Sequence, residues 1–237
     1  MKIYIDAGHG GNSIGAAYKG RLEQDDVLKL ALKIKELLLQ QPNIEVKLSR
    51  ETSVNPELSA RAEEANKWGA DYFISLHRNA FKPNAATGAE VWVYSKVSKQ
   101  GDTYKKAETI LKKLCAATGY ASRGVKLGAP SYADYAVNRL TKMHSCLLEI
   151  GFIDNDNDNA IFDSKFDEMA EAIARGLVEA VGGTWEEIKK PEAQEQPDSG
   201  IIYRVQIGAF SNKANAEAYA AKAKAAGFDA IITADKK

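Results

Sequence analysis

The strongest constraint on the fold is a short, nearly continuous apolar run at residues 71–77, which reads Asp-Tyr-Phe-Ile-Ser-Leu-His. Such a run is typical of a strand that is covered on both faces, as strands are in parallel sheets. Segments with helical periodicity lie on both sides of it, beginning with residues 25–40, where apolar residues recur every three or four positions. The run therefore predicts a buried strand between covering helices.

Strands and helices alternate along the first 183 residues. Helix-end signals support the assignments, because Pro42 follows the first helix, Gly69 the second and Gly182 the last. The fold class predicted is α/β, a twisted, mostly parallel sheet sandwiched by helices. The expected strands are 3–5, 44–48, 71–77, 91–94 and 145–150, and the expected helices are 25–40, 56–68, 103–118 and 165–181.

The composition changes after Trp185. Residues 189–200 hold one alanine as their only apolar side chain, which is typical of a linker. Beyond it we expect a strand at 201–210, a helix at 212–226 and a strand at 228–233, a βαβ unit too small to bury a core alone. The predicted domains are 1–183, a linker at 184–200 and a small unit at 201–237.

Charge and hydropathy exclude several functions. Lys and Arg together number 32, as do Asp and Glu, so no basic field is available to hold nucleic acid or an anionic membrane surface. No apolar run approaches the roughly 18 residues of a membrane span, and a strand pattern occupies the place of a signal peptide. We expect a chain made in the cytoplasm. Cys115 and Cys146 lack any CxxC spacing and are expected to be buried thiols.

Candidate chemistry gathers at the ends of the predicted strands. His9 follows the first strand, His77 closes the apolar strand, Glu149 lies near the end of the last strand, and Glu23 precedes the first helix. Loops at the carboxyl ends of parallel strands converge, so these side chains can meet. Two histidines and one carboxylate form the ligand set of a catalytic zinc, which leaves a further carboxylate as a base.

Other interpretations stay open on spacing alone. His9 could be a loop histidine bonded to backbone, His77 a satisfied core histidine, and Glu149 a buried acid in an ion pair. An acid inside Cys-Leu-Leu-Glu-Ile-Gly is costly without a nearby cation, which favours the metal. His144 lies on the opposite face of its strand, roughly 16 Å from Glu149, and has no expected ligand role. Cys146 is expected in the core.

Several motifs occur in an order and spacing that together resemble the zinc-dependent N-acetylmuramoyl-L-alanine amidase family, the type-3 catalytic domain of cell-wall hydrolases. The resemblance covers about residues 1–183. It implies that His9, Glu23 and His77 are zinc ligands and that Glu149 is the catalytic glutamate, with Asp25 as a second choice for Glu23. The motifs are residues 5–11, 22–25, 48–51, 61–66, 70–80, 88–91 and 148–153.

Three positions depart from the family pattern: Ala7 in place of Pro, Gln24 in place of Lys, and Arg78 in place of a small residue. None is an expected ligand. Arg78 follows His77 directly, so it could alter substrate preference.

The tail at 203–210, with Gly227-Phe228, resembles one half of a SPOR repeat, a peptidoglycan-binding module built from two βαβ units. A single unit leaves an apolar face unburied, so we expect it to bind the wall or to form a homodimer through its equivalent in a second chain. A partly ordered tail, and packing of the unit onto the catalytic domain of its own chain, are the alternatives.

The resemblance implies hydrolysis of the amide between N-acetylmuramic acid and L-alanine by a zinc-activated water, with bacterial peptidoglycan as the partner. Without an export signal, a phage or prophage endolysin that causes cell lysis is expected. A non-catalytic peptidoglycan-binding protein and a zinc peptidase acting on the stem peptide are the alternatives.

Overall fold

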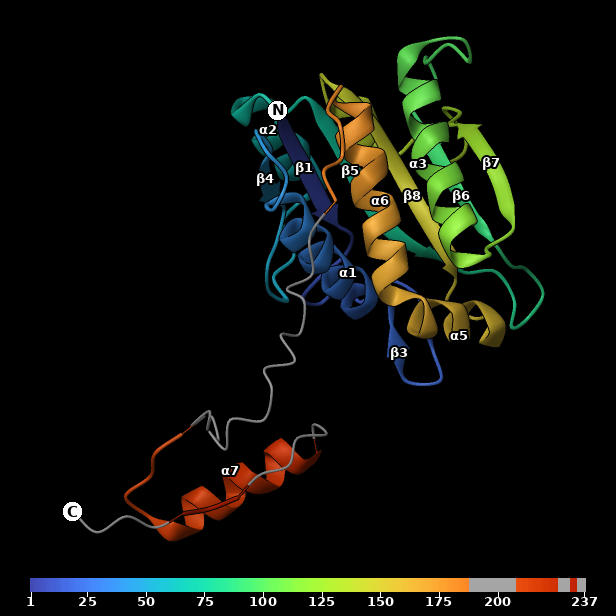
Figure 1. Cartoon of the computed structure of the whole chain (residues 1–237). Helices are drawn as coiled ribbons and strands as arrows, with labels where there is room; N and C mark the ends of the chain where they lie inside the picture. Colours follow the sequence, from blue (N-terminus) through green and yellow to red (C-terminus); the bar gives the residue numbers. More distant parts are fainter. Residues whose placement is uncertain (188–207, 226–230, 234–237) are drawn as a thin grey trace. The chain divides into compact units, whose positions relative to one another are not determined.

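The computed structural model describes residues 1–187, 208–225 and 231–233 (Figure 1). The chain divides into two compact units, Met1–Ile188 and Lys189–Lys237, which are treated separately below.

The first unit contains a six-stranded sheet with the order β4-β1-β5-β8-β6-β7. Strands β4, β1, β5 and β8 are mutually parallel, whereas β6 runs antiparallel to β8 and parallel to β7. This confirms the predicted α/β class with a mostly parallel sheet. The strands are β1 (Lys2–Ala7), β4 (Glu45–Leu48), β5 (Tyr72–Asn79), β6 (Ala89–Val93), β7 (Ser122–Leu127) and β8 (His144–Phe152).

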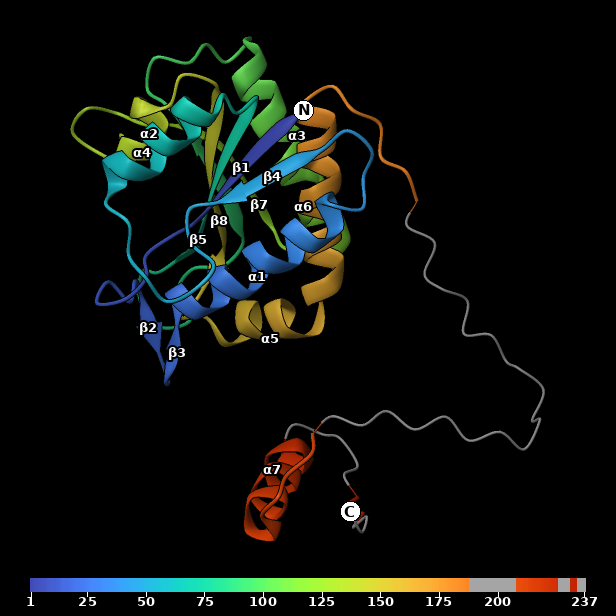
Figure 2. The same cartoon turned by 90° about the vertical axis from the view of Figure 1, so that its left-hand side faces the viewer.

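Helices cover the two faces of this sheet unequally. The long helices α1 (Glu23–Leu38), α3 (Asp102–Thr118) and α6 (Phe166–Ala180) lie on one face (Figure 2). The shorter helices α2 (Leu58–Trp68) and α4 (Ala136–Leu140) lie on the other. Helix α5 (Asp156–Ser164) follows β8, and a small hairpin, β2 (Ala17–Tyr18) with β3 (Arg21–Leu22), precedes α1.

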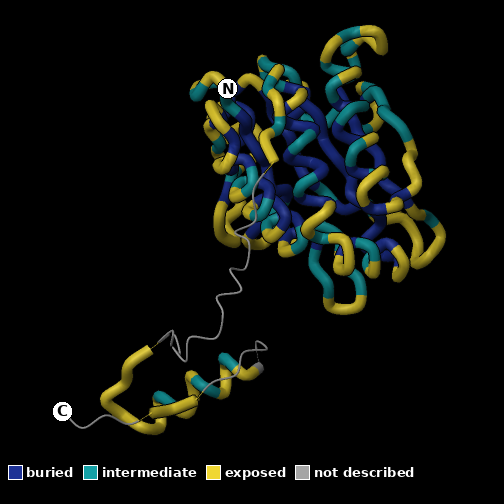
Figure 3. Tube along the Cα trace, viewed as in Figure 1, coloured by how far each residue is buried: buried dark blue, intermediate teal, exposed yellow. Residues whose placement is uncertain are grey.

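The larger core lies beneath α1, α3 and α6. Alternate strand residues such as Ile5, Ile74 and Leu148 are fully buried there, against helix residues such as Leu30 and Ile173. Buried stretches of the chain, drawn dark blue, gather at the centre of this unit in Figure 3. Apolar residues recur at every second position along the strands and at every third or fourth position along the helices, so they face one another between the sheet and these helices.

The smaller core lies between the sheet and helices α2 and α4, on the face opposite α1, α3 and α6. It occupies only part of that face. Towards the carboxyl ends of β1, β5 and β8 this same face becomes polar. A row of mostly buried polar side chains therefore lies at one end of the sheet. The apolar residues are Tyr4, Phe73, Trp92 and Leu147, and the polar ones that continue their face are Asp6, Ser75, His77, Glu90 and Glu149.

Some predicted boundaries were wrong. Helix α1 begins at Glu23 rather than at Asp25, so Glu23 occupies the first turn instead of the preceding loop. A carboxylate is favourable at this end of the helix dipole. The β2–β3 hairpin, β7, α4 and α5 were not anticipated, because two-residue strands, a strand with a central glycine and helices of five and nine residues carry little periodicity.

In the second unit, helix α7 (Lys213–Ala225) agrees with the helix expected at 212–226. The Phe210 ring lies 5.3 Å from that of Tyr219. The strands expected at 201–210 and 228–233 lie mostly outside the described residues. Across the described ranges, no helix has the length and apolar character needed to cross a membrane.

Candidate metal centre and catalytic site

Three side chains from three different elements converge at the carboxyl end of the sheet. His9 follows β1, Glu23 opens α1 and His77 lies near the end of β5. Their potential ligand atoms all lie within 4.8 Å of one another. Asp25 is exposed and does not belong to this group, so the geometry favours Glu23 at this position.

Glu23 is the centre of this group. Its Oε1 accepts hydrogen bonds from the Arg78 backbone N–H at 3.0 Å and from His77 Nδ1 at 2.8 Å, and lies 3.1 Å from His9 Nε2. Its Oε2 accepts from the Ala16 N–H at 2.8 Å. Burial alone would raise the pKa of Glu23, but the contacts with His77 and His9 outweigh it and hold this pKa well below its usual range. Glu23 is therefore an ionised oxygen donor at neutral pH.

The backbone of His9 has an unusual conformation. Its φ is 61°, in the left-handed region that residues other than glycine rarely adopt. Arg61 donates to the His9 carbonyl at 2.8 Å, and Gly10 and Ser13 bond to each other through their backbones. Ser13 Oγ lies 3.2 Å from His9 Nδ1, which leaves Nε2 directed at Glu23. Strained backbone of this kind persists where the surrounding bonds fix it, often at functional sites.

Two buried arginines hold the segment that carries His9. Arg61 pairs with Asp6 at 2.6 Å and also donates to the Ala7 carbonyl at 2.9 Å. Arg50 donates to the carbonyls of Ala7 and Gly8 at 2.9 and 2.8 Å. The segment thus gains fixed partners for carbonyl groups that neither the sheet nor a helix satisfies.

Two glycines make room for the converging side chains. A Cβ on Gly8 would lie 2.5 Å from Cε1 of His77, and one on Gly15 would lie 2.5 Å from Oε2 of Glu23. Gly15 also has a φ of +69°. The sequence analysis missed Gly15, whose only signal was its place in a loop between His9 and Glu23.

Glu149 lies beside this group on β8, where it pairs in register with His77 of β5. It is buried, and its Oε2 has no hydrogen-bond partner among the described residues. Burial raises the pKa of Glu149 to about 7, and the neighbouring carboxylates Glu23 and Glu90 add to the effect, while His77 opposes it. The carboxyl group can therefore gain or lose a proton near neutral pH.

These side chains open into a cavity of about 500 Å³. One wall is formed by the turn before α2, the other by α4 and the residue preceding it. The wall residues include Asn55, Glu57, Leu58, Tyr135 and Val137. The cavity thus lies where the two short helices leave the sheet uncovered.

Glu90 of β6 is a buried acid that the sequence analysis did not single out. Its Oε2 accepts from Arg123 and Lys126 at 2.7 and 2.9 Å, and its Oε1 accepts from Asn79 and from Trp92, both at 3.0 Å. Burial would raise the pKa of Glu90, but these donors lower it. Its position in a family motif was the only signal in the sequence.

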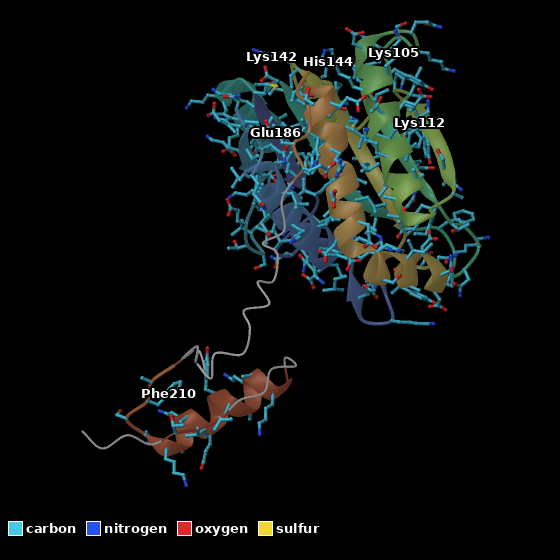
Figure 4. The ribbon with its side chains drawn as sticks, viewed as in Figure 1. Lys105, Lys112, Lys142, His144, Glu186 and Phe210 are labelled. Carbon is cyan, nitrogen blue, oxygen red and sulfur yellow. The ribbon has the colours of Figure 1, made fainter. Side chains whose placement is uncertain are left out.

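The residues assigned no ligand role lie elsewhere. His144 Nδ1 is 2.7 Å from Thr103 Oγ1, at the opposite end of β8 from Glu149 (Figure 4). Cys146 is fully buried in the larger core.

The side chain of Arg78 points away from the metal-ligand group. It is buried, binds Asp26 and Asn159, and stacks on Phe162 with 4.3 Å between Cζ and the ring centroid. Its contact with the site is the backbone N–H that donates to Glu23. No direct contact with a substrate follows from this placement.

Comparisons with known proteins agree with this picture. The family model described as N-acetylmuramoyl-L-alanine amidase matches residues 3–179, and the SPOR domain model matches residues 199–237. A sporulation-specific N-acetylmuramoyl-L-alanine amidase of Bacillus subtilis is 37% identical over 235 residues, covering 98% of this chain and 84% of the relative. The endolysin of Bacillus phage SPP1 is 35% identical over 209 residues, covering 84% and 73%.

Among solved structures, the N-acetylmuramoyl-L-alanine amidase from Clostridium difficile 630 is similar, with a TM-score of 0.70 and 31% identity. The similarity covers 76% of this chain and 96% of that one.

Proposed function

Because this chain belongs to the N-acetylmuramoyl-L-alanine amidase family, we propose that it hydrolyses the amide between N-acetylmuramic acid and L-alanine in peptidoglycan, using a zinc ion held by His9, Glu23 and His77. The observation that carries the proposal is the convergence of these three side chains within 4.8 Å beside the buried acid Glu149.

The residues present fit zinc. Two imidazole nitrogens and one carboxylate oxygen are a common ligand set for catalytic zinc, and the ionised Glu23 supplies the negative charge. The unpartnered Oε2 of Glu149 is a buried acceptor that a metal-site water could satisfy. When bound, zinc supplies a Lewis acid that polarises the amide carbonyl and acidifies water.

Glu149 is the proton carrier in this proposal. Its carboxylate takes a proton from the attacking water and later donates it to the leaving nitrogen of L-alanine. In the metal-free chain the pKa of Glu149 is raised to about 7 by burial, and a pKa near the working pH suits a group that must serve first as base and then as acid. Asp6 is paired with Arg61 and Glu90 with four donors, so neither is available for this role.

Ser13 and Arg61 have supporting roles. Ser13 at His9 Nδ1 fixes which ring nitrogen faces Glu23, as outer partners of metal-binding histidines commonly do. Arg61 holds the His9 backbone in its strained conformation.

Mass spectrometry of purified peptidoglycan after digestion tests the reaction. We expect released stem peptides that begin with a free L-alanine amine, and glycan strands that keep the lactyl group. Cleavage within the stem peptide would instead support a zinc peptidase, and binding without products would support a non-catalytic wall protein.

Metal analysis tests the ligands separately. We expect one zinc per chain in the purified protein and loss of zinc in His77→Ala. Full zinc content in that variant, or activity that survives a strong chelator, would reject the assignment.

The similarity to a phage endolysin favours a lytic role, whereas the similarity to a sporulation-specific amidase favours wall removal during spore formation. We propose the lytic role, with the enzyme reaching the wall once the membrane is opened. Lysis of cells that produce the chain, only after a membrane-permeabilising agent is added, would support it.

For residues 199–237, the SPOR match supports peptidoglycan binding. Co-sedimentation with purified, undigested peptidoglycan, comparing the Glu149→Gln chain with the same chain ended at Gly183, tests this. Pairing of two such segments into a homodimer remains a prediction, and light scattering on the same two proteins would decide it.

A further inference from the structure

The polar row that contains His77 and Glu149 continues across two more strands. Glu90 of β6 lies directly opposite Glu149 of β8, and β7 pairs with β6 on its other side. On β7, Arg123 and Lys126 both bind the same oxygen of Glu90, at 2.7 and 2.9 Å. Two cations therefore share one anion, which leaves one positive charge in excess.

These two cations retain unused hydrogen-bonding capacity. A guanidinium has five N–H donors. Across the described ranges, Arg123 uses Nε for Glu90 and makes one long contact of 3.5 Å to the Thr87 carbonyl. The Arg123 and Lys126 side chains are 37% and 34% exposed, so their remaining donors can reach a ligand.

Aromatic side chains hold both cations in place. Arg123 stacks on Phe152, with 5.0 Å from Cζ to the ring centroid, and the Lys126 ammonium lies 5.4 Å from the Trp92 ring centroid. Such contacts restrict flexible side chains. The pair is therefore ordered before any ligand arrives.

The pair lies within reach of the cavity. Asn79 lines the cavity and donates to Glu90, so a single hydrogen-bonded chain leads from the cavity to the cations. Two strand spacings separate β8 from β7, about 10 Å. An extended peptide advances about 7 Å over two residues. Three residues advance about 10 Å, and on the second residue the length of a side chain makes up the difference. A side-chain carboxylate on the second or third residue after the scissile amide would therefore reach Arg123 and Lys126.

The geometry points to Arg123 and Lys126 as a subsite that binds a carboxylate of the substrate's peptide, on the leaving side of the cleaved amide. The inference rests on the proposed amidase function. It adds a requirement on the substrate: its peptide should carry a free carboxyl group at this position and not the corresponding amide. Charge-assisted hydrogen bonds to a carboxylate are about twice as strong as those to a neutral group.

The test uses two matched substrates and three variants of the full chain. The substrates are N-acetylmuramoyl peptides that differ in one group, a free side-chain carboxyl or its carboxamide at the second residue. The variants are Arg123→Gln, Lys126→Gln and Arg123→Lys. The control is Lys112→Gln, which removes an exposed cation on α3, paired with Glu108 and on the other face of the sheet.

We expect the unaltered chain to have a KM for the carboxyl substrate about tenfold below that for the carboxamide. Arg123→Gln and Lys126→Gln should each raise KM several-fold for the carboxyl substrate alone, with kcat retained. Arg123→Lys should recover part of the loss, and the Lys112→Gln control should not change either constant.

Equal KM values for the two substrates in the unaltered chain would overturn the subsite. So would variants that lower kcat on both substrates alike, because that pattern would mean that the two cations act only through Glu90. Cleavage of neither substrate by the unaltered chain would instead reject the amidase function itself, so the two failures are distinguishable.

Discussion

Glu90 and Glu149 lie directly opposite each other on the antiparallel strands β6 and β8, yet their surroundings are opposite in character. Glu90 accepts hydrogen bonds from four side chains, whereas Oε2 of Glu149 has no partner in the part of the chain that the structure describes. Like charges at such a position destabilise a sheet. The negative charge therefore stays on Glu90, whereas the carboxyl group of Glu149 can gain or lose a proton.

This difference predicts how the metal-free protein responds to pH. The pKa of Glu149 is raised to about 7 in the folded chain, so the folded state binds more protons than the unfolded state between its ordinary pKa and pH 7. Stability should therefore fall as pH rises through this window. Glu149→Gln should remove the penalty, which is at most on the order of 3 kcal/mol. Urea unfolding at pH 5 and pH 8 gives the free energy of unfolding of the unaltered chain and of Glu149→Gln. If the two proteins differ in this free energy by the same amount at both pH values, the prediction is contradicted.

The same substitution should abolish turnover while leaving the metal in place. The amide of Glu149→Gln cannot accept a proton from water, and loss of a general base costs about a hundredfold or more. Initial rates on purified peptidoglycan, with zinc content measured on the same sample, check this. Activity within a few-fold of the unaltered chain would make Glu149 a structural residue.

Gly15 and Gly20 offer a matched pair for testing the crowding at the proposed metal site. Both have positive φ, +69° and +84°, but only Gly15 has a neighbour that an added Cβ would meet, Glu23 Oε2 at 2.5 Å. Each change to Ala carries backbone strain of about 1 kcal/mol. We expect Gly15→Ala also to weaken zinc binding at least tenfold in chelator competition. Equal zinc affinity in the two variants would refute the steric argument.

The buried pair of Arg61 and Asp6 should dominate the stability of the His9 segment. Both side chains are almost fully buried, and removing one partner of a buried pair typically costs 3–5 kcal/mol. Arg61→Met should lose about that much in urea unfolding, and the double change with Asp6→Asn should recover part of it. No recovery in the double variant would mean that the bonds of Arg61 to backbone carbonyls, and not its charge, stabilise the segment.

The sequence predicted the parts of this fold that depend on long periodic patterns. Helix α1 and strand β5 were both identified because their apolar residues recur over at least seven positions. Strand β7 was missed, since Ser-Arg-Gly-Val-Lys-Leu shows neither alternation nor a continuous apolar run. Its pairing with β6 depends on tertiary contacts that no local pattern records.

The candidate site was predictable only in part. His9, His77 and Glu149 could be selected by residue type and strand ends, whereas the choice of Glu23 over Asp25 depended on the family resemblance. The structure brings His9, Glu23 and His77 together beside Glu149. The positive φ of His9 and the bonds of Arg61 to it involve residues 52 positions apart, so spacing could not reveal them.

The contacts among His9, Glu23 and His77 have a further consequence for how the proposed zinc ion would bind. The ligand side chains touch one another in the folded chain, so their conformational entropy is lost during folding and little remains to be lost on capture of an ion. Removal and re-addition of the metal ion should then be reversible, with almost the same protein conformation in both forms. On the proposed zinc mechanism, the first unit would then keep its fold when the metal is removed and regain activity when zinc is added back.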